Sequence, residues 1–212
     1  DVQILGGIIL HEGKIAETLV HLLSDFALTK ICGITATSAT PSILKEATIC
    51  DSRVAFITAA RHLHKKVGSI LIVGGEKFGL VLFDKDGQYQ NYRSNTSCAA
   101  GTGSFLDQQA ERLHLKSIEE FSDIAYHNSA KIPKIASRCA VFAKTDLIHA
   151  QQEGYSLAEI CDGLCFGLVK NIADTLFSNT RPNGPLIFCG GVSKNRAVAK
   201  HFSRMLDVEV IT

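Results

Sequence analysis

The chain has 212 residues, a formal net charge of +1 at pH 7 and 46% hydrophobic residues. This length and composition are typical of one large or two small globular domains. The nearly neutral net charge argues against a protein that binds nucleic acid through a strongly basic surface. No apolar run reaches the length of a membrane span and no signal peptide opens the sequence, so we expect a cytoplasmic protein without membrane or nucleic-acid partners. The seven cysteines are odd in number and lack short repeated spacings, which argues against a disulfide framework.

The first part of the chain predicts strands alternating with helices. Apolar residues recur at helical spacing in two segments, and short β-branched runs lie between them. The Asp84-Lys85-Asp86-Gly87 stretch carries the Asp-Gly signal of a hairpin turn. The predicted elements are strands over 2–10, 31–35, 69–73, 79–84 and 88–93, helices over 15–26 and 53–64, and a loop over 37–41.

Helices predominate after Gly103. Ser117 with Glu120 and Ser156 with Glu159 form two capping-box patterns, which mark helix starts. Strands flanking this helical part indicate an α/β fold with a helical insertion. We expect an incomplete N-terminal subdomain over 1–94 and a second subdomain over 95–212. The predicted elements here are helices near 104–115, 117–128, 140–153, 156–178 and 193–206, and strands over 186–189 and 208–211.

Two of the predicted strands end in a pair of glycines, at Gly74-Gly75 and at Gly190-Gly191. Ligands of α/β sheets bind beyond the carboxyl ends of the strands, where glycines let backbone N–H groups approach phosphates. One such pair is explained by a tight turn alone. Two pairs, together with Gly101-Thr102-Gly103, favour a nucleotide site.

Cys98 lies among very small residues directly before a predicted helix, in which Ser104 and Asp107 fit an N-terminal cap. A helix start offers N–H groups and a positive dipole end, so this stretch predicts an anion site with one soft metal ligand. Cys139 repeats the arrangement, since small residues and a helical run follow it.

Two interpretations of Cys98 and Cys139 are compatible with the residues alone. Both are buried structural cysteines, or they supply two of the four thiolates of an iron–sulfur cluster that a second chain completes. Zinc is disfavoured because neither cysteine has a ligand partner at short spacing. The remaining cysteines are expected to be packing residues: Cys32, Cys50, Cys161, Cys165 and Cys189.

The segments SCAAGTGSFLDQQAERL and KIASRCAVFAKTDLI resemble the ATPase family that activates 2-hydroxyacyl-CoA dehydratases and benzoyl-CoA reductases. The resemblance implies an actin-like ATPase fold, related to ribonuclease H and the acetate and sugar kinases. It implies that Cys98 and Cys139 bind a [4Fe–4S] cluster shared within a homodimer or a tandem-module pseudo-dimer. It also implies ATP and Mg²⁺ as cofactors, and a dehydratase or reductase partner that receives a low-potential electron.

The resemblance also assigns the nucleotide site. LIFCGGVSKN is similar to the adenosine-binding turn of the family, and LIVGGEKFG takes the place of its second phosphate loop. The residues implied to bind nucleotide are Gly74, Gly75, Gly101, Thr102, Gly103, Gly190, Gly191 and Asn195.

The chain departs from the family pattern at the phosphate loop. Ile72 stands where the short activators carry an aspartate, and Glu76 with Lys77 replaces a Gln-Asp pair. Glu76 is therefore the candidate to hold Mg²⁺ or orient water. No first phosphate loop is found, and the sequence resembles a piece, cut at both ends, of a large multidomain activase-like protein. The alternative is a nucleotide-binding regulatory or assembly module that has lost hydrolysis; a small-molecule kinase of the same fold would leave the two cysteine segments unexplained.

Overall fold

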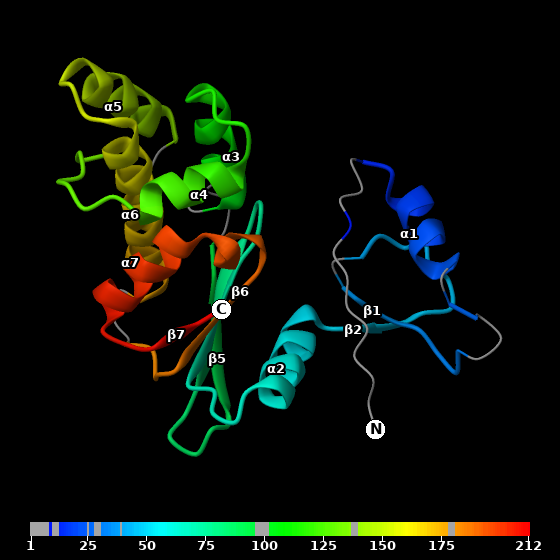
Figure 1. Cartoon of the computed structure of the whole chain (residues 1–212). Helices are drawn as coiled ribbons and strands as arrows, with labels where there is room; N and C mark the ends of the chain where they lie inside the picture. The colour runs from blue at the N-terminus through cyan, green and yellow to red at the C-terminus, as the bar shows by residue number, and fades with distance from the viewer. Residues whose placement is uncertain are drawn as a thin grey trace. The chain divides into compact units, whose positions relative to one another are not determined.

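The computed structural model describes residues 9, 13–24, 26–27, 31–38, 40–95, 102–136, 140–177 and 181–212. The chain divides into two compact units, Asp1–Phe56 and Ile57–Thr212 (Figure 1). The strands between residues 57 and 94 belong to the sheet of the second unit.

The described residues of the first unit include a helix and a small parallel sheet. Helix α1 spans Ile15–Ser24, and strand β1 (Thr35–Thr37) pairs with β2 (Thr48–Cys50). The strand predicted over 31–35 is wrong in position, since residues 31–34 have no regular structure, and β2 was not predicted. Three residues are too few for alternation to be recognised. Most of the strand predicted over 2–10 lies outside the described residues.

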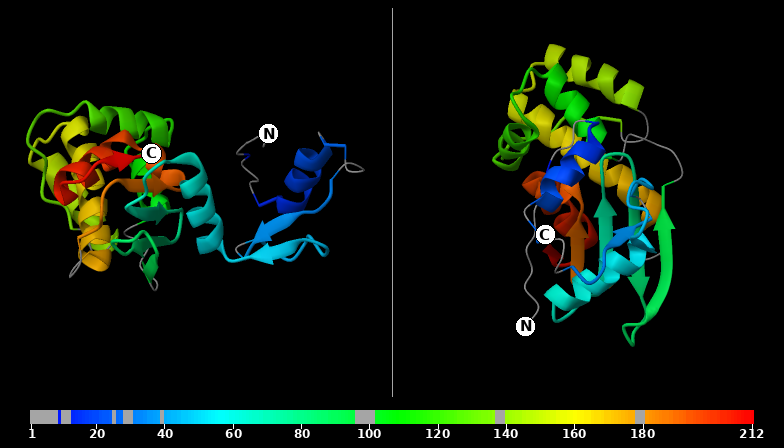
Figure 2. Two further views of the ribbon diagram at one scale, coloured as in Figure 1. Left: turned by 90° about the horizontal axis from the view of Figure 1, so that it is seen from below. Right: turned by 90° about the vertical axis from the view of Figure 1, so that its right-hand side faces the viewer.

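The second unit is built on a five-stranded mixed sheet with the order β5-β4-β3-β6-β7 (Figure 2). Strands β3 and β6 are parallel neighbours, and β7 is parallel to β6. Strand β4 runs antiparallel to β3, and β5 runs antiparallel to β4. The strand bounds are Ser69–Val73 for β3, Phe78–Phe83 for β4, Tyr89–Ser94 for β5, Leu186–Cys189 for β6 and Val210–Ile211 for β7.

The helices of this unit match the predicted segments closely. Ser156 and Glu159 complete a capping box at the start of α6. Ser117 accepts a hydrogen bond from the Glu120 N–H, but the Glu120 carboxylate accepts from the Lys116 N–H, so that box is shifted by one residue. The bounds are Ser52–Leu63 for α2, Gly103–Arg112 for α3, Ile118–Tyr126 for α4, Ala140–Gln152 for α5, Leu157–Leu176 for α6, Gly191–Lys194 for the 3₁₀ helix η3 and Arg196–Leu206 for α7.

Both faces of the sheet are covered, which is why β3 and β4 read as continuous apolar runs rather than as alternating ones. Leu71 and Val73 pack into the larger core with the helices from α3 to α7. Ile70 belongs to a second buried cluster with Ala60 of α2. In the described part of the chain, no helix combines the length and apolarity needed to cross a bilayer.

Candidate functional site

The two glycine turns lie side by side at one edge of the sheet. Because β3 and β6 are parallel and in register from Ser69↔Leu186 to Ile72↔Cys189, both strands end at the same edge. Gly190 has φ +96°, and a Cβ there would overlap the carbonyl oxygen of Val73 and lie 2.8 Å from its carbonyl carbon. Only glycine fits this position, so the second turn is held directly against the end of β3.

The start of α3 joins the same edge. The Gly103 N–H donates to the Gly74 carbonyl (2.9 Å), and the Ser104 N–H donates to the Gly75 carbonyl (3.0 Å). A Cβ on Gly103 would lie 3.1 Å from the Val192 side chain, just beyond the second turn. We call the meeting point of these three segments (Gly74–Gly75, Gly103 and Gly190–Gly191) the glycine corner.

The start of α3 differs in detail from the prediction. Thr102, fully buried, is the N-cap residue, rather than Ser104. The Ser104 hydroxyl instead donates to the Gly75 carbonyl at 2.5 Å. The Gly74 and Gly75 carbonyls of the phosphate-loop candidate therefore accept hydrogen bonds from two N–H groups at the start of α3. We had expected these N–H groups to be available to an anion.

Asn195 is at the start of α7, but its side chain turns inward. Its Oδ1 accepts from the Val198 N–H (3.1 Å), and its Nδ2 lies 3.7 Å from the Cys165 sulfur. The residue is only 5% exposed. Asn195 thus fixes the helix that follows the Gly190–Gly191 turn, and its N-cap role satisfies a helix N–H that would otherwise be unpaired.

Glu76 is exposed in the short connection between β3 and β4, beside Gly75. The Gly74 N–H closes this connection by donating to the Lys77 carbonyl at 2.8 Å. Ile72, at the position where an aspartate was expected from the resemblance, is a half-buried strand residue that pairs with Cys189. Glu76 is consequently the carboxylate that the phosphate-loop candidate itself presents at this edge.

Two further carboxylates, one on α3 and one on α4, interact electrostatically. Burial raises the pKa of Asp107, and the negative charge of Glu119 raises it further. A hydrogen bond from the Ser117 hydroxyl is the main cause of the lowered pKa of Glu119, and the positive charge of Lys194 adds to it. Lys194 ends η3, which follows the Gly190–Gly191 turn. Acidic residues in a first helical turn were the signal that could have identified Glu119.

The predicted metal ligands Cys98 and Cys139 lie outside the described residues, as does Gly101. The chain that enters the first cysteine segment is fixed to β4, since Asn95 Oδ1 accepts from the Phe78 N–H (2.8 Å). The chain that enters the second is fixed to α5, since Asp146 Oδ2 accepts from the Ala136 N–H (2.7 Å). Within the described ranges, no cluster of three or more histidine, cysteine or acidic residues could hold a metal ion.

The described cysteines of the second unit are buried or half-buried thiols. Burial is the main cause of a pKa of about 12 for Cys161 and about 11 for Cys189, and burial also raises the pKa of Cys165. Without a bound metal, such thiols stay protonated at neutral pH and are poor nucleophiles. Their environment agrees with the packing role expected from the sequence.

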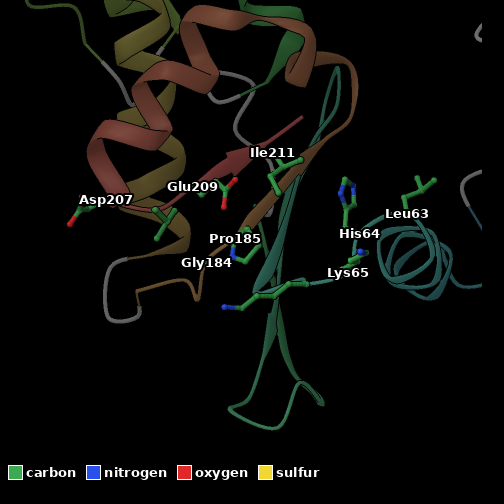
Figure 3. Close-up of a pocket in the computed structure, with 10 residues that line it drawn as sticks. Leu63, His64, Lys65, Gly184, Pro185, Asp207, Glu209 and Ile211 are labelled. Atoms are coloured by element: carbon green, nitrogen blue, oxygen red, sulfur yellow. The ribbon is translucent and has the colours of Figure 1, made fainter.

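A cavity of about 620 Å³ lies at the opposite edge of the sheet, where β3 and β6 begin (Figure 3). Lys65 and Pro185 precede these strands, and Asp207 and Glu209 precede β7. Nucleotides bind at the carboxyl edge of such sheets, so this mixed-charge cavity at the amino edge is not the expected place for phosphates. We locate the candidate site at the glycine corner.

A mixed sheet with glycine turns at its carboxyl edge, and a helical insertion between the two turns, is the architecture of the actin-like ATPase fold. The structure superimposes on that of the activator of 2-hydroxyisocaproyl-CoA dehydratase from Clostridium difficile with bound ADPNP, with a TM-score of 0.83 and 20% identity. The superposition covers 98% of this chain and 77% of that one. At this identity the likeness establishes the fold.

Residues 27–212 match the BadF/BadG/BcrA/BcrD ATPase family, and the chain belongs to that family. It is 27% identical over 143 residues to the 2-hydroxyisocaproyl-CoA dehydratase activator of Clostridioides difficile, covering 68% of this chain and 53% of the activator. It is 26% identical over 148 residues to one of the subunits of benzoyl-CoA reductase from Thauera aromatica, covering 70% of this chain and 52% of that relative. The chain thus spans about half the length of these curated relatives.

Proposed function

We propose that this chain is the nucleotide- and cluster-binding part of an ATP-dependent iron–sulfur activator. Such a protein would drive low-potential electron transfer to a 2-hydroxyacyl-CoA dehydratase or a benzoyl-CoA reductase-like partner. The observation that carries the proposal is the glycine corner, where three glycine segments meet at the carboxyl edge of the sheet. The names of the relatives, a dehydratase activator and a component of a reductase, support the nature of the partner.

In this proposal the glycine corner binds ATP. Gly74 and Gly75 would approach the phosphates, and Gly190 and Gly191 would contact the adenosine part, where the absence of Cβ atoms permits close approach. Glu76 would hold Mg²⁺ or orient the attacking water, because it is the exposed carboxylate of that turn. Hydrolysis consumes one water and releases ADP and phosphate.

The same proposal assigns Cys98 and Cys139 as cluster ligands. Cys161 and Cys165 are fully buried packing residues of α6, and the similarity of the segments around Cys98 and Cys139 to those of the family supports this pair instead. Two thiolates per chain require a second chain or a second tandem module to complete four. When bound, the cluster supplies one-electron chemistry, with the electron taken from a low-potential reductant and passed to the partner enzyme.

Iron and acid-labile sulfide per chain, measured after anaerobic purification, test the cluster. We expect about two irons per chain in the wild type, loss in Cys98→Ser and in Cys139→Ser, and retention in the control Cys32→Ser, whose cysteine is exposed. A folded, anaerobically purified protein that binds nucleotide but no iron would refute the cluster and leave both cysteines structural.

A nucleotide-binding regulatory or assembly module without hydrolysis remains the second candidate. The observation that favours it is Ile72, a strand residue at the position where the family pattern carries an aspartate. Phosphate release from ATP with and without Mg²⁺ separates the two candidates. Mg²⁺-dependent release that Glu76→Gln abolishes, while nucleotide binding persists, supports the activator; nucleotide binding without release, even with the partner present, supports the module.

A further inference from the structure

A buried polar network outside the glycine corner centres on Asp162 of α6. This residue is only 5% exposed, and its carboxylate has two partners from other parts of the chain. Oδ1 lies 2.6 Å from Nε2 of His201 on α7, and Oδ2 accepts from Nδ2 of Asn128 at 3.0 Å. Burial alone would raise the pKa of Asp162, but these hydrogen bonds and the charges of His201 and Lys200 lower it. Asp162 is therefore an ionised carboxylate in the interior, and a buried charge of this kind requires its partners.

One arm of the network reaches the loop that leads to the second cysteine segment. The Asn128 side chain donates a hydrogen bond to Asp162 and also makes two hydrogen bonds within its own loop. Its Oδ1 accepts from the Ala130 N–H (3.1 Å), and its Nδ2 donates to the Ala130 carbonyl (3.2 Å). The loop then crosses α6 at close range: a Cβ on Gly163 would lie 3.1 Å from the Pro133 ring. Residues 128–136 are thus seated on the part of α6 that carries Asp162.

The other arm reaches the glycine corner. His201 belongs to α7, whose N-cap is Asn195, and the Gly190–Gly191 turn and η3 come directly before it. Asn195 makes a second connection between the same two helices, through its contact with Cys165 of α6. The path from the turn to the cysteine loop therefore runs through α7, the Asp162–His201 pair and Asn128, without a gap in contact.

We propose that Asp162 is a positioning residue that fixes loop 128–136 to α7, so that nucleotide bound at the Gly190–Gly191 turn steadies the loop leading to Cys139. This inference rests on the proposed nucleotide site and deepens it by naming the connection between that site and one cysteine segment. The physical basis is that hydrogen bonds in one network strengthen each other, and that chains of packed side chains and hydrogen bonds carry coupling between separated sites.

Hydrogen exchange of the peptide covering residues 128–136, with and without saturating ADPNP, tests the proposal. The Ala130 and Ala136 N–H groups, both bonded to side chains, are the reporters. In the wild type, ADPNP should slow their exchange by about fivefold, the lower range of typical coupling between sites. In Asp162→Asn this ratio should fall to about one, because the substitution removes the charge that holds both arms. The control Asp174→Asn, on the same helix but paired at the surface with Lys170, should keep the wild-type ratio.

A second variant covers the case in which Asp162→Asn does not fold. Asn128→Ala removes the loop arm and leaves the Asp162–His201 pair in place, and it should also abolish the ADPNP effect. A merely structural role would loosen the loop equally with and without nucleotide, leaving the ratio unchanged. The inference is overturned if either variant keeps the wild-type ratio of exchange rates without and with ADPNP. It is also overturned if bound ADPNP does not slow exchange of the loop in the wild type. A separate titration of ADPNP distinguishes this failure from that of the nucleotide site, since a wild type that binds no ADPNP overturns the proposed function and the inference with it.

Discussion

Replacing single glycines by alanine tests the geometry of the glycine corner, because three glycines of the second unit differ in what a methyl group would meet. Gly190 has φ +96° and lies against Val73, Gly87 has φ +75° with open space around it, and Gly191 has open space without a positive φ. Gly87→Ala should therefore cost only the left-handed conformation, about 1–2 kcal/mol. In Gly190→Ala, the overlap of the new methyl group with the Val73 backbone should add a destabilisation of about 1–3 kcal/mol. The total loss of unfolding free energy should therefore be about 2–5 kcal/mol.

Gly191→Ala should leave stability within about 1 kcal/mol of the wild type, since alanine there meets no neighbour and restricts the unfolded chain. Its effect should appear in nucleotide binding, because a methyl group occupies the space through which we propose that the adenosine part approaches. Urea unfolding followed by circular dichroism measures the first quantity, and titration of a fluorescent ADP analogue measures the second. Equal stability of Gly190→Ala and Gly87→Ala would refute the contact between the turn and β3. Unchanged ADP affinity in Gly191→Ala would remove that residue from the site.

Three further predictions concern the helical part and the cysteines. Gly163→Ala should not show the stabilisation of about 1 kcal/mol usual for alanine in a helix, because its Cβ would lie 3.1 Å from Pro133; urea unfolding measures this. Iodoacetamide at pH 8 should alkylate exposed Cys32 about tenfold or more faster than Cys161, whose thiol pKa burial raises to about 12; peptide mass spectrometry reads both rates. The difference in unfolding free energy between wild type and Asp162→Asn should shrink as the pH falls below about 4, because the pKa of Asp162 is lowered in the folded state and its stabilisation is lost on protonation.

Each of these has a result that would contradict its reasoning. A Gly163→Ala protein more stable than the wild type would place loop 131–136 away from α6. Equal alkylation of the two cysteines would mean that α6 opens far more readily than its buried contacts indicate. A pH-independent difference between wild type and Asp162→Asn would mean that the carboxylate gains nothing from its partners in the fold.

Much of the second unit could be predicted from the sequence because its signals are local. The capping box of Ser156 and Glu159 and the Asp-Gly turn at Gly87 depend on residues a few positions apart, and both are present. The paired glycines could be recognised at strand ends for the same reason. Their meeting could not be worked out, because it depends on β3 and β6 being neighbours although helices separate them along the chain.

Three side-chain arrangements could not be predicted from local patterns, and they have the same physical origin. The spacing of Ser104 to Asp107 predicted that Ser104 caps a helix. Its hydroxyl instead donates a hydrogen bond to the Gly75 carbonyl, which is distant in the sequence. The inward turn of Asn195 depends on Cys165 of another helix. Asp162 carries no local motif, and its role became visible only when α6 and α7 brought it against His201. Contacts with residues distant in the sequence set the orientation of each of these side chains.

The two cysteine segments are connected to the glycine corner by routes of different length, which bears on how ATP could act. The chain leaves the Cys98 segment directly into Gly103, whose N–H bonds to Gly74, so any shift of the phosphate-loop candidate moves that exit through one hydrogen bond. A connection to the loop before Cys139 runs through α7, Asp162 and Asn128. Abolishing the Asp162 connection should leave the response of the first segment intact while the second becomes insensitive, which separates a concerted motion of the two segments from two independent ones.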